Sequence, residues 1–275
     1  MSDYREINGA YWNERVAAHV ASPDYGVARF AEDPAFLSNV VRFDLPRLGD
    51  IAGQDAVHLQ CHIGTDTVSL ARLGARVTGL DLSGPALEEA RKLAISANVD
   101  ARFVQAEAYD ALDVLDEGAF DLVYTGVGAL CWLPDVRRWA GIVASLLRPG
   151  GRLHIREGHP VLWSLADVRP DGLLAIELPY FEQPEPILCD EGGTYVQTEV
   201  VFSQNLTHEW NHGLGEIVTA LLEHGMRLTM FEEHDSVPWE AFPGQMKDIG
   251  GGEWRLADRP ERLPHTYTLQ ARKLS

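Results

Sequence analysis

Short apolar runs alternate with amphipathic segments between residues 55 and 157. The runs have the length of buried strands, and they predict strands over 56–60, 76–80, 101–105, 120–124 and 152–156. The intervening segments carry apolar residues at helical spacing, most clearly at Trp139, Ile142, Val143 and Leu146. This alternation is typical of an α/β domain in which helices connect parallel strands.

Capping and turn residues bound the expected helices. The first helix, around 67–73, stops at Gly74. Residues 83–85 (Ser-Gly-Pro) open the next helix with a capping hydroxyl and a first-turn proline. A further helix begins at 134–135 (Pro-Asp), and residues 148–151 (Arg-Pro-Gly-Gly) end it before the fifth strand.

The pattern changes after Pro160. Residues 160–211 contain nine acidic residues, a single basic residue and five prolines. Such a segment predicts an insertion that covers a site, not another strand and helix. Regular structure returns with a helical stripe over 214–222, which is followed by expected strands at 226–232 and 265–271.

Acidic residues dominate the composition and narrow the classes of partner. The 275 residues include 41 acidic and 23 basic side chains, which gives a formal net charge of −18. A nucleic acid would meet net repulsion, so we expect no nucleic-acid partner. The charge favours a neutral or cationic small-molecule substrate.

Nothing in the sequence predicts a membrane segment or an export signal. No apolar run approaches the roughly 20 residues that span a bilayer, and residues 1–11 carry charged side chains in place of an apolar core. Cys61, Cys131 and Cys189 are odd in number and too far apart for a CxxC metal pair. We therefore expect a cytoplasmic protein with no membrane partner and no bound metal, and we leave open a homodimer.

The turn after the first strand is the expected ligand site, because ligands of open α/β sheets bind where the strand order reverses. Gly64 ends this turn and can let the backbone approach a ligand, and the helix beyond it favours an anion at its N-terminus. Asp81 ends the second strand, and its carboxylate can accept hydrogen bonds from two ribose hydroxyls. These residues predict a nucleoside-binding site.

Four motifs in register resemble those of class I methyltransferases. They are the segments 77–83 (VTGLDLS), 103–108 (FVQAEA), 120–124 (FDLVY) and 146–153 (LLRPGGRL). The final helix and two strands are similar to the end of that family's sheet, which contains an antiparallel seventh strand. The resemblance implies a Rossmann-like α/β fold: a seven-stranded, mostly parallel sheet with helices on both faces and an inserted lid.

The resemblance also implies S-adenosylmethionine as cofactor and S-adenosylhomocysteine as product. Asp81 would bind the ribose hydroxyls, Glu107 and Ala108 would lie at the adenine, and Gly64 would lie near the methionine moiety. Tyr11 would donate to the cofactor carboxylate, or its Tyr-Trp segment only packs on the core. The expected cofactor contacts are Tyr11, Gln60, His62, Gly64, Asp81, Leu82, Glu107, Ala108 and Thr125.

A single domain of four parts follows from these patterns. We expect an N-terminal helical cap over 1–50 and a cofactor-binding core over 51–159. A lid insertion over 160–212 and a C-terminal helix with antiparallel strands over 213–275 complete the chain.

The first motif departs from the family's acidic-x-Gly-x-Gly-x-Gly pattern. His58 stands at the acidic position, and Gln60 and His62 replace the first two glycines. Only Gly64 is kept. The side chains of Gln60 and His62 would therefore have to point away from the cofactor or form hydrogen bonds with it.

Three residues are candidates for substrate-side catalysis. Glu157 and His159 lie at or just beyond the end of the fifth strand, and His212 closes the lid segment. A histidine with a pKa near neutrality suits removal of a proton from an acceptor oxygen. The alternative for His159 is that the His159-Pro160 pair only turns the chain into the insertion.

Two other chemistries are weighed against methyl transfer. Residues 208–212 match the HExxH zinc pattern, but the expected helix begins only at Leu214, so both histidines lie on an extended or turn segment. An NAD-dependent oxidoreductase would also use Asp81, yet the GxGxxG pattern is absent. The degenerate first motif further leaves open a non-catalytic module that binds a nucleoside or S-adenosylmethionine.

Aromatic side chains gather in the lid and the C-terminal region, where they can line a site for an aromatic or cationic substrate or only pack the lid. They are Trp163, Tyr180, Phe181, Tyr195, Trp210, Trp239 and Phe242. We predict an enzyme, a methyltransferase that moves the methyl group of S-adenosylmethionine to O, N or C of a small-molecule metabolite. Its catalysis would come mainly from proximity and alignment.

Overall fold

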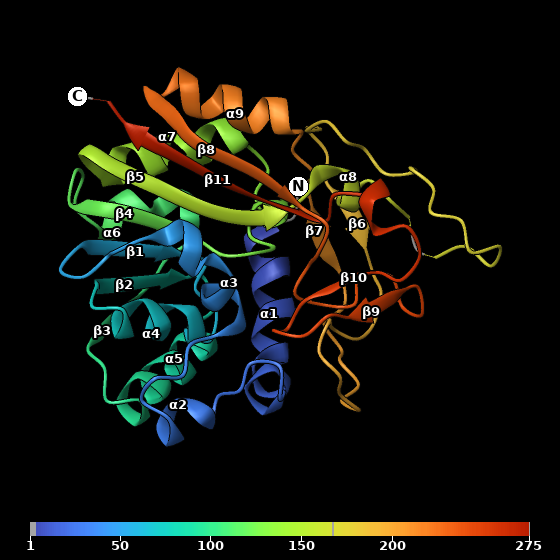
Figure 1. Ribbon diagram of the computed structural model, residues 1–275, viewed down its shortest axis with the longest axis horizontal. Coiled ribbons are helices and arrows are strands. Elements are labelled where there is room, and N and C mark those ends of the chain that lie inside the picture. The colour runs from blue at the N-terminus through green and yellow to red at the C-terminus, as the bar shows by residue number, and fades with distance from the viewer. Residues whose placement is uncertain (1–3, 167, 275) are drawn as a thin grey trace.

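A seven-stranded sheet organises residues 4–166 and 168–274, the parts of the chain that this computed structural model describes (Figure 1). Its strand order is β3-β2-β1-β4-β5-β11-β8, and β11 runs antiparallel to both of its neighbours. The strands are β1 (Asp55–Leu59), β2 (Arg76–Asp81), β3 (Ala101–Gln105), β4 (Phe120–Thr125), β5 (Leu147–Gly158), β8 (Met226–His234) and β11 (Thr266–Lys273). The predicted α/β sheet of seven mostly parallel strands is confirmed.

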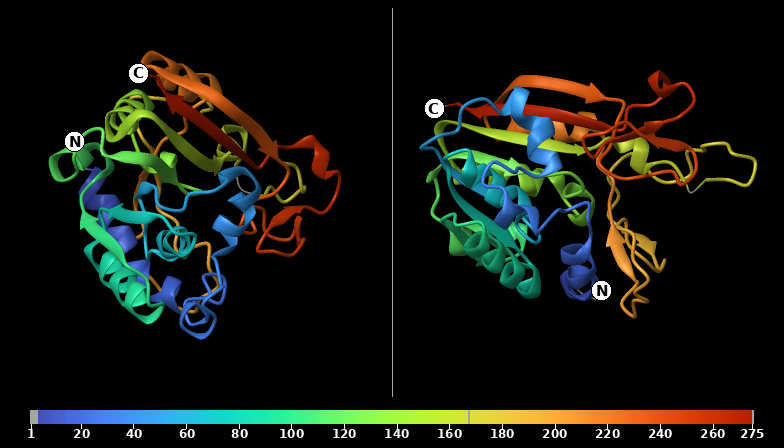
Figure 2. Two further views of the ribbon diagram at one scale, coloured as in Figure 1. Left: turned by 60° about the vertical axis from the view of Figure 1, so that its left-hand side comes forward. Right: turned by 60° about the horizontal axis from the view of Figure 1, so that its bottom comes forward.

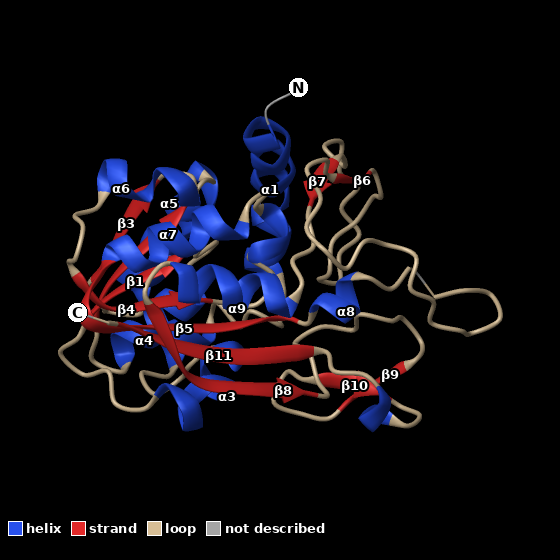
Figure 3. Cartoon of the chain, turned by 90° about the horizontal axis from the view of Figure 1, so that it is seen from above, coloured by secondary structure: helices blue, strands red, loops and turns tan. Residues whose placement is uncertain are grey.

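Alternating residues of the strands bury two separate apolar faces. On one face, Val57 and Val123 pack with α7 (Val136–Leu146) and α9 (Leu214–Glu223). On the other, Ala56 and Leu122 pack with α3 (Asn39–Leu48) and α4 (Thr65–Arg72), while α5 (Gly84–Ser96) covers β3. Helices therefore cover both faces, as expected and as Figure 3 shows.

Most predicted boundaries agree with the structure to within two residues. The fifth strand is the exception, because β5 begins at Leu147, where Leu147 pairs with Phe120 of β4. The expected turn at 148–151 is therefore part of a strand that is interrupted by a register shift. The helix before it ends at Leu146, one residue ahead of that pairing.

Helix α1 (Tyr4–Ala21) lies across the carboxyl ends of the parallel strands (Figure 1). The segments 160–166 and 168–212, which we name the lid, project beyond the same end of the sheet (Figure 2). The lid holds α8 (Pro160–Trp163) and a small antiparallel pair, β6 (Ile187–Cys189) with β7 (Thr207–Glu209). A second pair, β9 (Met246–Asp248) with β10 (Trp254–Leu256), lies beside it and was not predicted. The remaining short helices are α2 (Arg29–Glu32) and α6 (Ala111–Val114).

No helix within the described residues is long and apolar enough to cross a membrane.

Candidate functional site

The loop that follows β1 has an unusual backbone. Gln60, His62 and Gly64 all adopt left-handed conformations, with φ of 55°, 49° and 78°. For a residue with a Cβ atom, this conformation costs roughly 1–2 kcal/mol of conformational free energy. The two positions at which glycine is replaced therefore keep a glycine-like backbone in spite of their side chains. Strain of this kind is often concentrated at functional sites.

The side chains of Gln60 and His62 point in different directions. Gln60 Nε2 donates to the carbonyl of Ala129, 2.9 Å away, in the loop after β4. His62 Nε2 lies 2.8 Å from Nδ1 of His19 on α1. The side chains of Gln60 and His62 thus join the loop after β1, hereafter the first loop, to the loop after β4 and to α1.

Both the backbone conformation and the packing of neighbouring side chains require glycine at position 64. A Cβ atom at this position would lie 2.7 Å from Cβ of Ala90 and 3.1 Å from the ring of Phe103. Since real Cβ contacts are longer, any other residue would push α4 away from α5. The contact between these helices therefore requires glycine here, whatever a ligand requires.

Asp81 ends β2 beside the first loop. Its Oδ2 accepts from the backbone N–H of His62 (2.7 Å), and its Oδ1 accepts from that of Ser83 (2.8 Å). Burial raises the pKa of this carboxyl, while the two N–H donors oppose the rise. Ser83 Oγ caps α5 by accepting from the N–H of Ala86, so Asp81 is not needed as the cap. Each Asp81 oxygen keeps lone-pair capacity for a ligand hydroxyl.

The expected adenine end of the site lies against α1. Glu107 is buried, accepts from the hydroxyl of Tyr4 (3.1 Å) and forms an ion pair with Arg5 (3.1 Å). Burial raises the pKa of Glu107, and the ion pair with Arg5 opposes this. The buried Ala108 follows it, and Leu82 lies under α1 at Gly9, where a Cβ atom would be 3.6 Å from Leu82 Cδ2.

Thr125 ends β4 and pairs with Leu59 of β1, where the strand order reverses. Its Oγ1 and the Oε1 of Gln60 are both buried, and neither has a hydrogen-bond partner among the described residues. An unsatisfied buried polar atom costs about 1–3 kcal/mol. These two atoms therefore fit a site that a polar ligand group completes.

Tyr11 lies on the α1 face that meets the lid. Its ring covers the guanidinium of Arg15, 3.4 Å from ring centroid to carbon, and lies 5.9 Å from the ring of Trp132. Burial raises the pKa of Tyr11. The neighbouring Trp12 contacts the ring of His62 at 5.2 Å. The Tyr-Trp segment therefore reaches the loop after β1.

Glu157 holds a loop in place. Its carboxylate accepts from the backbone N–H groups of Gly128 (2.6 Å), Ala129 (2.8 Å), Leu130 (2.9 Å) and Gly158 (2.6 Å). Burial raises the pKa of Glu157, and the four donors oppose this. Because the Glu157 carboxylate accepts from so many backbone groups, we infer that it positions the loop after β4.

His159 lies between the start of α8 and β8. Its Nδ1 accepts from the N–H of Val161 (3.1 Å) at the start of α8, so its Nε2 carries the proton and donates to Glu233 (2.9 Å) on β8. Burial lowers its pKa despite the contact with Glu233. With both nitrogens engaged, this histidine caps α8 and turns the chain into the lid.

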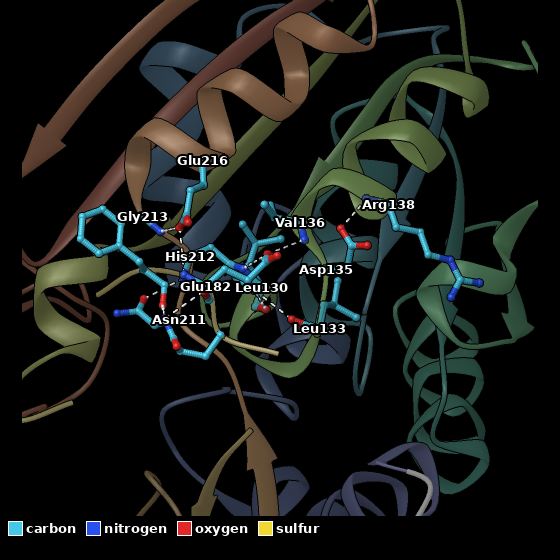
Figure 4. A network of polar contacts seen from close by, with 12 residues as sticks. Leu130, Leu133, Asp135, Val136, Arg138, Glu182, Asn211, His212, Gly213 and Glu216 are labelled. Carbon is cyan, nitrogen blue, oxygen red and sulfur yellow. Dashed lines mark hydrogen bonds and ion pairs between the residues drawn. The ribbon is translucent and has the colours of Figure 1, made fainter. Parts of the chain in front are cut away.

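His212 is the centre of a buried polar network (Figure 4). Its Nε2 donates to the carbonyls of Leu130 (3.1 Å) and Leu133 (2.8 Å), and its Nδ1 lies 2.7 Å from Glu182. Carbonyls only accept, so the ring must carry a proton on Nε2. Burial alone would raise the pKa of Glu182, but the hydrogen bonds from His212 and from the N–H of Val136 lower it. The network ties the lid to the loop before α7.

The HExxH segment has no helical geometry. Thr207–Glu209 form β7, and α9 begins only at Leu214, so the prediction of an extended segment is confirmed. Within the described ranges, no group of three or more His, Cys, Asp or Glu side chains could hold a metal ion.

Sequence reasoning missed the residues of α1 that hold the lid. Arg15 donates to the carbonyls of Gly193 (3.0 Å) and Gln204 (2.7 Å), and His19 Nε2 lies 2.7 Å from Thr194 Oγ1. Their spacing of four along a helix, in phase with Tyr11, was the available signal. Their contacts lie 170 residues or more away in the sequence, so the sequence alone could not predict them.

Comparison with known proteins identifies the class of the domain. Residues 56–151 match the family model described as a methyltransferase domain. These residues form a methyltransferase domain. The predicted family is thus confirmed, and the model match covers the loop after β1, Asp81 and Glu107.

This chain spans about half the length of the named relatives that it matches. A ubiquinone biosynthesis O-methyltransferase from Albidiferax ferrireducens is 34% identical over 119 residues, which are 43% of this chain and 47% of that protein. One from Cronobacter sakazakii is 34% identical over 107 residues, 39% of this chain and 43% of that protein.

Solved structures extend the fold match to most of the chain. An S-adenosylmethionine-dependent methyltransferase from Mesorhizobium loti has a TM-score of 0.56 at 24% identity and covers 88% of this chain and 98% of its own. One from Clostridium acetobutylicum has a TM-score of 0.56 at 13% identity, with 86% and 90% covered. The predicted Rossmann-like methyltransferase fold is confirmed.

Proposed function

We propose that this protein transfers the methyl group of S-adenosylmethionine to a small molecule. The observation that carries the proposal is the loop after β1. At the point where the strand order reverses, three alternate residues keep left-handed backbones, and the N–H of His62 is held by Asp81. The match of residues 56–151 to a methyltransferase domain supports the same function.

The residues present fit the cofactor. Asp81 would take the ribose hydroxyls, and Leu82, Glu107 and Ala108 would border the adenine. The orphaned Gln60 Oε1 and Thr125 Oγ1 would accept from the amino group of the methionine moiety. His62, Gly64 and Tyr11 would complete this end. When bound, the cofactor supplies a methyl group on a sulfonium centre that readily leaves as a thioether.

The chain's own contribution is mainly orientation. Glu157 fixes the loop 128–130, and Gln60 joins that loop to the first one. Glu157, His159 and His212, the predicted catalytic residues, have their polar atoms occupied by structural partners. We therefore propose positioning roles for them. Alignment of reactants alone contributes about 7–11 kcal/mol in favourable cases.

A small metabolite fits the acceptor side better than a macromolecule. The relatives named above are ubiquinone biosynthesis O-methyltransferases, which supports a small acceptor without settling whether O, N or C receives the methyl group. The formal net charge of −18 opposes a nucleic-acid partner. A cytoplasmic location and a homodimer stay predictions.

The two alternatives make different binding predictions. A non-catalytic module would bind S-adenosylmethionine without turnover of any acceptor. A nicotinamide enzyme would need close approach of backbone to a pyrophosphate, and Gln60 and His62 place side chains at the positions where that motif needs glycine. The match of residues 56–151 to a methyltransferase domain favours the methyltransferase over the nicotinamide enzyme.

Calorimetric titration with S-adenosylmethionine, S-adenosylhomocysteine and NAD tests the proposal. We expect micromolar binding of the first two to the native chain and to Asp113→Ala, an exposed control. Asp81→Ala should weaken binding at least tenfold while the protein stays folded by circular dichroism. Binding of NAD alone, or equal binding by both variants, would contradict the proposal.

A further inference from the structure

A cavity of about 190 Å³ lies between the lid, α8 and residues 239–243. Its walls are mostly aromatic and apolar, and they include three tryptophans: Trp163, Trp210 and Trp239. An apolar cavity of roughly 150 Å³ in another protein is large enough for benzene. This cavity therefore has room for one six-membered ring with a short substituent.

Two of the tryptophans stack on each other and form one wall of the cavity. The rings of Trp163 and Trp239 stack at 5.7 Å between centroids, with an interplanar angle of 20°. Trp163 is held against the end of β5, because a Cβ atom at Gly158 would lie 2.5 Å from its indole nitrogen. Such a fixed ring presents its face to a ligand at little entropic cost.

Glu209 is the only charged residue that lines the cavity within the described chain. Its Oε1 accepts from the hydroxyl of Thr207 (2.7 Å), and no cationic side chain of the described ranges forms an ion pair with it. Burial raises the pKa of this carboxyl. Because this half-buried carboxylate has no cationic partner, it favours a ligand that brings a positive charge.

The other polar side chain of the cavity is not available to a ligand. The Nδ2 of Asn211 donates to the carbonyls of Pro160 (2.8 Å) and Pro179 (2.9 Å), and its Oδ1 accepts from the N–H of His212 (3.0 Å). Asn211 thus shapes the wall and leaves Glu209 as the group that discriminates by charge.

A continuous set of aromatic rings joins the cavity to the cofactor loop. Trp239 lies 6.4 Å from Tyr195, Tyr195 lies 6.4 Å from Trp12, and Trp12 lies 5.2 Å from His62. Cys131, which lines the cavity, is two residues from Ala129, the partner of Gln60. The cavity is therefore next to the proposed methyl-transfer site.

We propose that this cavity binds a small amine on a single ring, with the ammonium at Glu209 and the ring against the tryptophan wall. Cation–π attraction to Trp163, Trp210 and Trp239 and the Coulomb attraction of Glu209 act in the same direction. The identification of this amine as the methyl acceptor rests on the proposed function. Recognition of the amine by the cavity does not depend on the proposed function.

Three probes of nearly equal shape and different charge test the proposal: 2-phenylethylamine, 2-phenylethanol and 3-phenylpropionate. Each is titrated calorimetrically at pH 7.5 into the full chain, with and without S-adenosylhomocysteine. We expect the amine to bind at least tenfold more tightly than the alcohol and the carboxylate not to bind. Glu209→Gln should remove this preference while binding of the alcohol is kept, and the exposed lid variant Glu199→Gln should leave it unchanged.

Equal binding of amine and alcohol, binding of the carboxylate, absence of binding by all three, or a preference that survives Glu209→Gln would overturn the proposal. The same titrations distinguish a failure of the proposed function from a failure of the amine site. Amine binding by a chain that does not bind S-adenosylmethionine would contradict the methyltransferase and leave the amine site standing.

Discussion

At the scale of single residues, the first loop keeps its shape without its usual glycines. Gln60 and His62 adopt φ of 55° and 49°, and the side chain of each contacts another element of the fold. The sequence could show that glycine was replaced here, but not that the backbone would stay left-handed. That outcome depends on Ala129 and His19, which are distant in sequence.

The strain at Gln60 predicts a contrast between two small substitutions. Gln60→Gly relieves the left-handed strain, whereas Gln60→Ala keeps it, and both lose the hydrogen bond to Ala129. Gln60→Gly should therefore be more stable than Gln60→Ala by about 1 kcal/mol in urea unfolding. The opposite order would mean that the loop is not strained.

Glu157 allows a second prediction at this scale. Glu157→Gln replaces an acceptor-only carboxylate with an amide, whose NH₂ group faces backbone donors. The free energy of unfolding should fall by about 2–4 kcal/mol, measured by chemical denaturation beside Glu117→Gln, an exposed control. A loss equal to that of the control would show that the four hydrogen bonds contribute little.

At the scale of elements, α1 connects the loop after β1 with the lid. His19 contacts His62 on one side and Thr194 on the other, and Arg15 holds the lid at Gly193 and Gln204. The strands and main helices of the core follow from periodicity and caps, which are local signals. The α1–lid contacts and the β9–β10 pair do not, because they are tertiary contacts of short or irregular segments.

The buried His19 makes this connection sensitive to acid. Burial lowers its pKa to about 4, so the unfolded state binds more protons between about pH 6.5 and 4. Stability from the neutral ring is therefore present above pH 6.5 and is lost as the pH falls toward 4, by up to about 3 kcal/mol. Once exchange rates are corrected for their intrinsic dependence on pH, the protection factors of amides 193–205 should fall over this range.

His19→Gln serves as the matched variant for that measurement. It removes the titrating ring while it keeps a polar side chain, so the free energy of unfolding should depend less on pH between 6.5 and 4 than in the native chain. Identical pH profiles for the two proteins would show that His19 does not control the contact between α1 and the lid.

At the scale of the whole molecule, the elements converge on the carboxyl ends of the parallel strands. The loop after β1, where the strand order reverses, contacts α1 through His62 and the loop after β4 through Gln60, and α1 in turn contacts the lid through Arg15. The sequence predicted this location, because motifs around Gly64, Asp81 and Glu107 follow successive strands. It could not predict that Glu157, His159 and His212 would be occupied by structural partners, since those partners are far apart in the chain.

A crystal structure with S-adenosylhomocysteine tests the central claim most directly. The account predicts the ribose hydroxyls on Asp81 and the amino group within hydrogen-bond distance of Gln60 Oε1 and Thr125 Oγ1. The left-handed backbone at Gln60 and His62 should be unchanged. A ligand bound elsewhere, or a first loop that must rebuild before binding, would contradict the claim that this loop is the cofactor site.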